Sequence, residues 1–159
     1  MSKEDKYNKL YIDIADRISA MSYAKRLQVG CVIVKDDNII SFGWNGMPSG
    51  WNNECETKVY FIEPELENSY VFPYEDEVGK YRLVTKPEVL HAESNAIAKL
   101  SKSKESSESA TLYCTHAPCI ECSKLIFQSG IKKVFYREAY RSSDGTNFLE
   151  KSGVKVTKI

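Results

Sequence analysis

Two short motifs carry side chains able to bind a metal ion and move a proton. His91 and Glu93 stand in HAE, and Cys119 and Cys122 stand in PCIEC. One imidazole and two thiols are ligands that zinc favours, and a site with only three protein ligands keeps its fourth position for water, as catalytic zinc does. A carboxylate beside that position can take the water's proton. The spacing therefore predicts a catalytic zinc centre at the three ligands, with Glu93 as the acid and base.

Two other interpretations of the cysteine pair stay open. A Cys-x-x-Cys pair after a strand is also typical of thioredoxin-like redox sites, although that chemistry needs neither His91 nor Glu93. A purely structural zinc needs a fourth protein ligand. The residues able to supply it are Cys31, Cys55, Cys114 and His116. Cys31 and Cys114 lie in apolar runs that favour the core, whereas Cys55 lies in a polar loop with no obvious partner.

The elements that must position these residues follow from the hydrophobic pattern. Apolar residues at helical spacing predict helices over 6–21, 90–101 and 119–128, the last beginning at Pro118. β-rich runs predict strands over 29–34, 39–42, 111–115, 133–137 and 154–159, with a short helix before the last one. The order α-β-β-α-β-α-β-α-β predicts an α/β fold, in which helices cover both faces of a central mixed five-stranded sheet.

Residues 51–89 interrupt this pattern with an aromatic, acid-rich stretch that has no clear period. Because 159 residues bury one full core but not two, we expect a single domain over 1–159, with 51–89 as an insertion. Its aromatic side chains are expected to hold it by packing, without a second zinc. They are Trp51, Tyr60, Phe61, Tyr70, Phe72, Tyr74 and Tyr81.

Charge and hydropathy argue against several classes of partner. The 22 Lys and Arg residues balance the 22 Asp and Glu residues, so the chain lacks the positive field typical of nucleic-acid-binding proteins. No stretch approaches the ~20 apolar residues of a membrane span, and the N-terminus has no signal-peptide core. Five cysteines at irregular spacing favour metal or thiol roles over disulfides. We therefore expect a cytoplasmic protein, in the host cytoplasm if it is virally encoded, with neither nucleic acid nor membrane as partner.

The chain resembles the deoxycytidylate deaminases of the cytidine-deaminase superfamily, of the viral (phage) or bacterial type. The resemblance runs over about residues 19–159 through VGCVIV, GWNGMPSG, HAESNAI, TLYCTHAPCIEC and KKVFYREAYRSSDGTNFLEKSGV. It implies a three-layer α/β/α cytidine-deaminase-like fold. It also implies zinc-dependent hydrolysis of dCMP to dUMP and ammonia, which supplies dUMP for thymidylate synthesis.

The resemblance assigns further residues to the substrate. Asn45 would contact the sugar, Ser22, Arg26 and Tyr140 would surround the phosphate, and Ala92 and Thr115 would also contact the nucleotide. An arginine suits a phosphate through its bidentate, permanently charged fork. A solvated cation near a helix end is the alternative for Arg26.

The resemblance also implies regulation and assembly. Family members are typically homohexamers, activated by dCTP and inhibited by dTTP, each bound with Mg²⁺. The regulatory nucleotide would lie at Gly43, Gly46, Gly50 and Asn95, although a plain turn explains the glycines equally well. Three alternatives stay open: dCTP as a second substrate, deamination of a polynucleotide such as tRNA adenosine, and a zinc-stabilised binding module with no activity.

Overall fold

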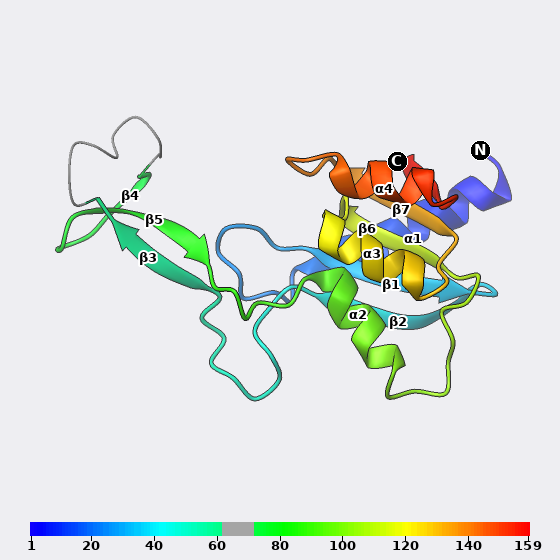
Figure 1. The fold of residues 1–159 in the computed structure, drawn as a ribbon, viewed down its shortest axis with the longest axis horizontal. Coiled ribbons are helices and arrows are strands. Elements are labelled where there is room, and N and C mark those ends of the chain that lie inside the picture. Colours follow the sequence, from blue (N-terminus) through cyan, green and yellow to red (C-terminus); the bar gives the residue numbers. More distant parts are fainter. Residues whose placement is uncertain (62–71) are drawn as a thin grey trace.

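The computed structural model describes residues 1–61 and 72–159, and Figure 1 shows their arrangement. The elements of the main body are α1 (Lys3–Ser19), β1 (Gly30–Lys35), β2 (Asn38–Trp44), α2 (Ala92–Leu100), β6 (Thr111–His116), α3 (Ile120–Gln128), β7 (Lys133–Glu138), α4 (Asp144–Lys151) and β8 (Lys155–Lys158). Five strands form one sheet in the order β2-β1-β6-β7-β8. β1 runs antiparallel to both of its neighbours, and β6, β7 and β8 are parallel. The predicted mixed five-stranded sheet is confirmed.

Helices cover both faces of this sheet. Along β1, Cys31 and Ile33 pack into a core shared with α2, α3 and α4, whereas Val32 and Val34 pack against α1. This alternation follows from the two-residue period of a strand. The three-layer α/β/α architecture is therefore confirmed, with α1 on one face of the sheet and α2, α3 and α4 on the other. None of the helices within the described residues is long and apolar enough to cross a membrane.

The first helix begins earlier than its apolar pattern predicts. The expected range was 6–21, but α1 starts at Lys3 because Ser2 caps it: the Ser2 hydroxyl accepts from the Asp5 N–H, and the Asp5 carboxylate accepts from the Ser2 N–H. Further along α1, Asp13 and Asp16 form ion pairs with Arg137 of β7. These ion pairs join α1 to β7, the strand next to the edge strand β8.

A second sheet of three strands, which we call the arm, extends away from the main sheet (Figure 1). It consists of β3 (Glu56–Tyr60), β4 (Tyr74–Glu75) and β5 (Lys80–Thr85), in the order β3-β5-β4. The ring of Tyr81 lies 5.5 Å from that of Tyr60 and 5.4 Å from that of Tyr74. Sequence analysis predicted aromatic packing here but no strands. Tyr70, included in that expectation, lies outside the described residues.

Candidate active site

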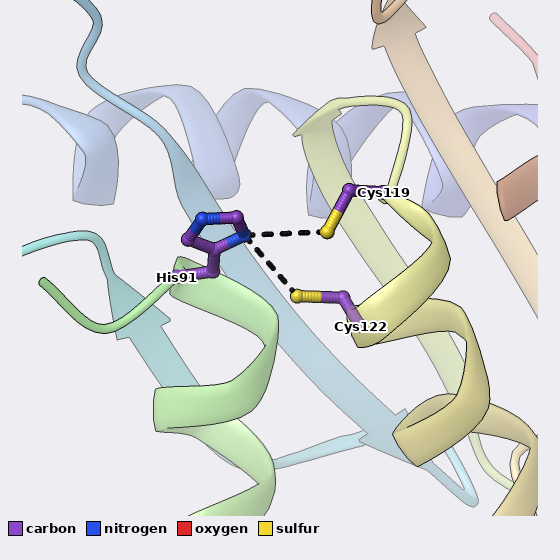
Figure 2. A group of neighbouring side chains, drawn as sticks. All are labelled: His91, Cys119 and Cys122. Carbon is purple, nitrogen blue, oxygen red and sulfur yellow. Dashed lines mark hydrogen bonds between the residues drawn. The ribbon is translucent and has the colours of Figure 1, made fainter. Parts of the chain in front are cut away.

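Two helices begin at neighbouring points and present their first residues to each other (Figure 2). His91 is the N-cap residue of α2, Cys119 is the N-cap residue of α3, and Cys122 lies in the first turn of α3. The His91 Nδ1 atom lies 3.5 Å from the Cys119 sulfur and 3.4 Å from the Cys122 sulfur. All three donor atoms lie within 4.8 Å of one another. This set of one nitrogen and two sulfurs fits a single zinc ion.

Backbone hydrogen bonds fix the chain just before each helix. Leu90, which precedes His91, exchanges two hydrogen bonds with Gly46, at 3.1 and 2.9 Å. Ala117, ahead of Cys119, donates to the Glu138 carbonyl at 2.8 Å. The donors therefore lie at the N-terminal ends of two anchored helices, where the positive end of the helix dipole favours thiolates.

The three donor groups differ in their affinity for a proton. Hydrogen bonds from the Cys122 thiol and from His91 lower the pKa of Cys119 to about 3. The hydrogen bond to Cys119, together with burial, raises the pKa of the Cys122 thiol. The hydrogen bond to Cys119 also raises the pKa of His91. The site thus stabilises the thiolate form of Cys119. A divalent metal ion bound here would displace the proton that Cys122 still carries.

Glu93 lies in the first turn of α2, two residues after His91, and is only 4% exposed. Burial raises the pKa of its carboxyl group, and the same group interacts with the Cys122 thiol. A carboxyl group with raised proton affinity beside a metal-binding cluster is suited to accepting and returning a proton.

The four residues considered as a further zinc ligand lie elsewhere. Cys31 and Cys114 are fully buried and face each other across β1 and β6. The His116 Nδ1 atom lies 3.0 Å from the Thr115 hydroxyl. Cys55 was expected in a polar loop, but it is only 1% exposed, because it packs at the base of the arm. In the part of the chain that the structure describes, only the three predicted ligands form a group able to hold a metal.

The loop between α1 and β1 contains two of the predicted substrate residues, Ser22 and Arg26. Asn45 holds this loop: its Oδ1 accepts from the Val29 N–H and its Nδ2 donates to the Leu27 carbonyl, both at 2.8 Å. The Ser22 hydroxyl donates to the Asn45 carbonyl at 2.7 Å. Ser22 and Asn45 therefore shape the loop, a role that residue type and spacing did not reveal.

The remaining predicted substrate residues lie in α2, in β6 and in the segment that follows β7. Ala92 is fully buried directly after His91. Thr115 is buried near the end of β6, where its hydroxyl accepts from the Gly30 N–H at 3.2 Å. Tyr140 follows β7, is half-buried, and has the Arg141 guanidinium 5.5 Å from the centre of its ring. Their contacts with a nucleotide stay predictions.

The residues predicted to bind a regulatory nucleotide each have a structural explanation. A Cβ atom on Gly43 would lie 2.4 Å from the Ala92 carbonyl oxygen, so a glycine there lets α2 pack closely on β2. Asn95 donates from its side chain to the Trp44 carbonyl at 3.1 Å. Gly46 forms a bridge with Leu90, and Gly50 has a positive φ of 85°. The regulatory role of these four residues stays a prediction.

Comparison with known proteins agrees with this geometry. Residues 1–138 match the family model described as the cytidine and deoxycytidylate deaminase zinc-binding region. The chain therefore belongs to the cytidine and deoxycytidylate deaminase family.

Within that family, the chain is similar to phage deoxycytidylate deaminases. It is 34% identical to the deoxycytidylate deaminase of Enterobacteria phage T4, over 93% of this chain and 87% of that protein. It also matches the crystal structure of the dCMP deaminase from the cyanophage S-TIM5 in complex with dCMP and dUMP, with a TM-score of 0.78 and 41% identity, over 100% of this chain and 99% of that one. A bacterial relative, ComE operon protein 2 of Bacillus subtilis, is 29% identical over 96% of this chain and 71% of its own length. The predicted resemblance is confirmed.

Proposed function

We propose that this protein is a zinc-dependent enzyme that hydrolyses dCMP to dUMP and ammonia. The observation that carries the proposal is the single group of His91, Cys119 and Cys122, with the buried carboxyl of Glu93 beside it. Neither a redox pair nor a structural zinc site requires that carboxyl group. The similarity to phage deoxycytidylate deaminases supports dCMP as the substrate.

In the proposed reaction His91, Cys119 and Cys122 would hold the zinc ion, which would supply the Lewis acidity that activates water for attack. Glu93 accepts a proton from the attacking water and delivers it to N3 of the cytosine ring. The water oxygen bonds to C4, and Glu93 then takes the second proton from the new hydroxyl group and passes it to the amino nitrogen. The bond from C4 to that nitrogen breaks, and dCMP and water become dUMP and ammonia. Because burial raises the pKa of the Glu93 carboxyl group, that group can hold a proton between accepting it from water and delivering it to the substrate.

The proposed nucleotide contacts divide between the sugar and the phosphate. Asn45 contacts the sugar while holding the adjacent loop, and Ala92 and Thr115 line the site of the base. Arg26 and Tyr140 contact the phosphate. The Ser22 hydroxyl donates its hydrogen bond to the Asn45 carbonyl, so it has no donor left for the phosphate. We therefore assign Ser22 to shaping the loop around Arg26.

Regulation and assembly extend the proposal through the resemblance. We propose that dCTP activates and dTTP inhibits the enzyme, each with Mg²⁺, near Gly43, Gly46, Gly50 and Asn95, in a hexamer. The support for this part is the sequence resemblance, because the four residues also have the packing and hydrogen-bonding roles described above.

A substrate panel tests the proposed function. The loss of cytosine absorbance would be followed for the zinc-loaded protein with dCMP, dCTP and deoxycytidine, each with and without dCTP or dTTP as effector. We expect turnover of dCMP, stimulated by dCTP and suppressed by dTTP. Consumption of dCTP itself would show that the phosphate site near Arg26 is wider than proposed. An absence of turnover with all three compounds would contradict the assignment to a free nucleotide.

A further inference from the structure

The base of the arm contacts the loop that carries Arg26. Glu56 is the first residue of β3, Thr85 is the last residue of β5, and the two are directly paired. The Glu56 Oε1 atom accepts hydrogen bonds from the backbone N–H groups of Lys25 at 2.8 Å and of Arg26 at 3.1 Å. The Thr85 hydroxyl accepts from the Arg26 guanidinium at 3.1 Å. The arm therefore holds both the backbone and the side chain of Arg26.

These contacts fix Arg26 without neutralising its charge. The Glu56 carboxylate is directed at backbone N–H groups, and the guanidinium donates to a neutral hydroxyl. Within residues 1–61 and 72–159, Arg26 takes part in none of the ion pairs. A guanidinium has five N–H donors in a planar fork, so the remaining donors stay free for a phosphate.

The other side of the same loop is joined to the metal-binding residues. Asn45 bonds the loop at Leu27 and Val29, and the next residue, Gly46, exchanges hydrogen bonds with Leu90, which precedes His91. The loop is thus anchored between the arm and the candidate metal site. The position of Arg26 relative to that site depends on both anchors.

We infer that Glu56 and Thr85 are positioning residues that give the enzyme its preference for a nucleoside monophosphate over the unphosphorylated nucleoside. By holding Arg26 in place before the substrate arrives, they reduce the cost of ordering the guanidinium around the phosphate. This inference rests on the proposed function and on the assignment of Arg26 to the phosphate. It gives the arm a role in substrate selection, although the arm supplies none of the three metal donors.

The test compares two substrates that differ only in the phosphate. Glu56→Ala is expected to lower kcat/KM for dCMP by about 20-fold, mainly through KM, and to leave kcat/KM for deoxycytidine within about twofold. Glu56→Gln keeps an acceptor oxygen and is expected to restore most of the loss. Glu54→Ala is the matched control, because Glu54 lies two residues before Glu56 at the base of the arm and its side chain is 74% exposed. Thr85→Val, which removes only the acceptor for the guanidinium, is expected to show a smaller loss of the same selectivity.

A double substitution separates positioning from general destabilisation. In an Arg26→Ala background, Glu56→Ala is expected to have no further effect on dCMP, because Glu56 acts through Arg26. Equal losses with dCMP and deoxycytidine, at unchanged zinc content, would overturn the inference. A lower KM for dCMP in Glu56→Ala would also overturn it, since the carboxylate would then be competing with the phosphate for the loop N–H groups. Failure of the wild-type protein to turn over dCMP would instead contradict the proposed function, and this inference with it.

Discussion

Glu93→Ala is expected to lower kcat for dCMP by about 10³-fold or more while zinc stays bound. Glu93 is the only buried carboxyl group in the described residues, and it is not one of the three clustered metal donors. Alanine at this position removes the proton carrier without removing a ligand. The measurements are kcat from cytosine absorbance and zinc content by atomic absorption, with the same protein samples used for both.

Two companion variants make the Glu93 result specific. Glu93→Gln keeps the size of the side chain but cannot carry the proton, so it is expected to be nearly as slow as Glu93→Ala. Glu121→Ala is the matched control, because Glu121 also lies in the first turn of a ligand-bearing helix but its side chain is 75% exposed. We expect Glu121→Ala to keep kcat within about twofold of the wild type. Full activity in Glu93→Ala would show that the proton is carried by another group.

The second large effect is expected for Cys122→Ala, which should remove both zinc and activity. Cys122 is buried, and its sulfur lies 3.4 Å from the His91 nitrogen, so alanine leaves two donors where three converged. Metal affinity is expected to fall by more than about 100-fold, because a zinc ion with only two protein ligands is weakly held. After dialysis the variant should contain less than about a tenth of the wild-type zinc.

Cys55→Ala provides the control for losing a buried thiol. Cys55 is as buried as Cys122, but its thiol donates to the Asn53 carbonyl at the base of the arm and does not belong to the metal-binding group. We expect this variant to retain its zinc and its activity on dCMP. Retention of zinc by Cys122→Ala, or loss of zinc by Cys55→Ala, would contradict the assigned ligand set.

The metal cluster and the strands of the main sheet could be predicted because residues close together in the sequence carry the signals for them. HAE and PCIEC each place their residues within one helical turn, and apolar periodicity shows that a helix begins at each motif. The β-rich runs likewise predicted the five strands of the main sheet in their chain order, whereas the order of those strands across the sheet is known only from the structure. Only the ends of elements differed, as at α1, where a capping box at Ser2 starts the helix before its apolar stripe.

The arm and its contacts could not be predicted in the same way. The strands of the arm are half-exposed on both faces, so they lack the alternation that marks a strand with one buried face. Tyrosine rings and the Lys58–Asp76 ion pair hold them instead. The contact from Glu56 to Arg26 joins residues 30 positions apart. Contacts between residues so far apart depend on how the elements pack together, and the hydrophobic pattern of one sequence does not predict that packing.

The most direct test of the account is a zinc titration of the metal-free protein, with dCMP turnover as the readout. Zinc would be removed with a chelator and returned in small increments, and dUMP formation would be measured at each step. We predict no turnover without metal, a linear rise as zinc is added, and a break at about one zinc per chain, because one three-donor group supports one catalytic ion. Turnover that does not depend on zinc, or a break at about two ions per chain, would contradict the account.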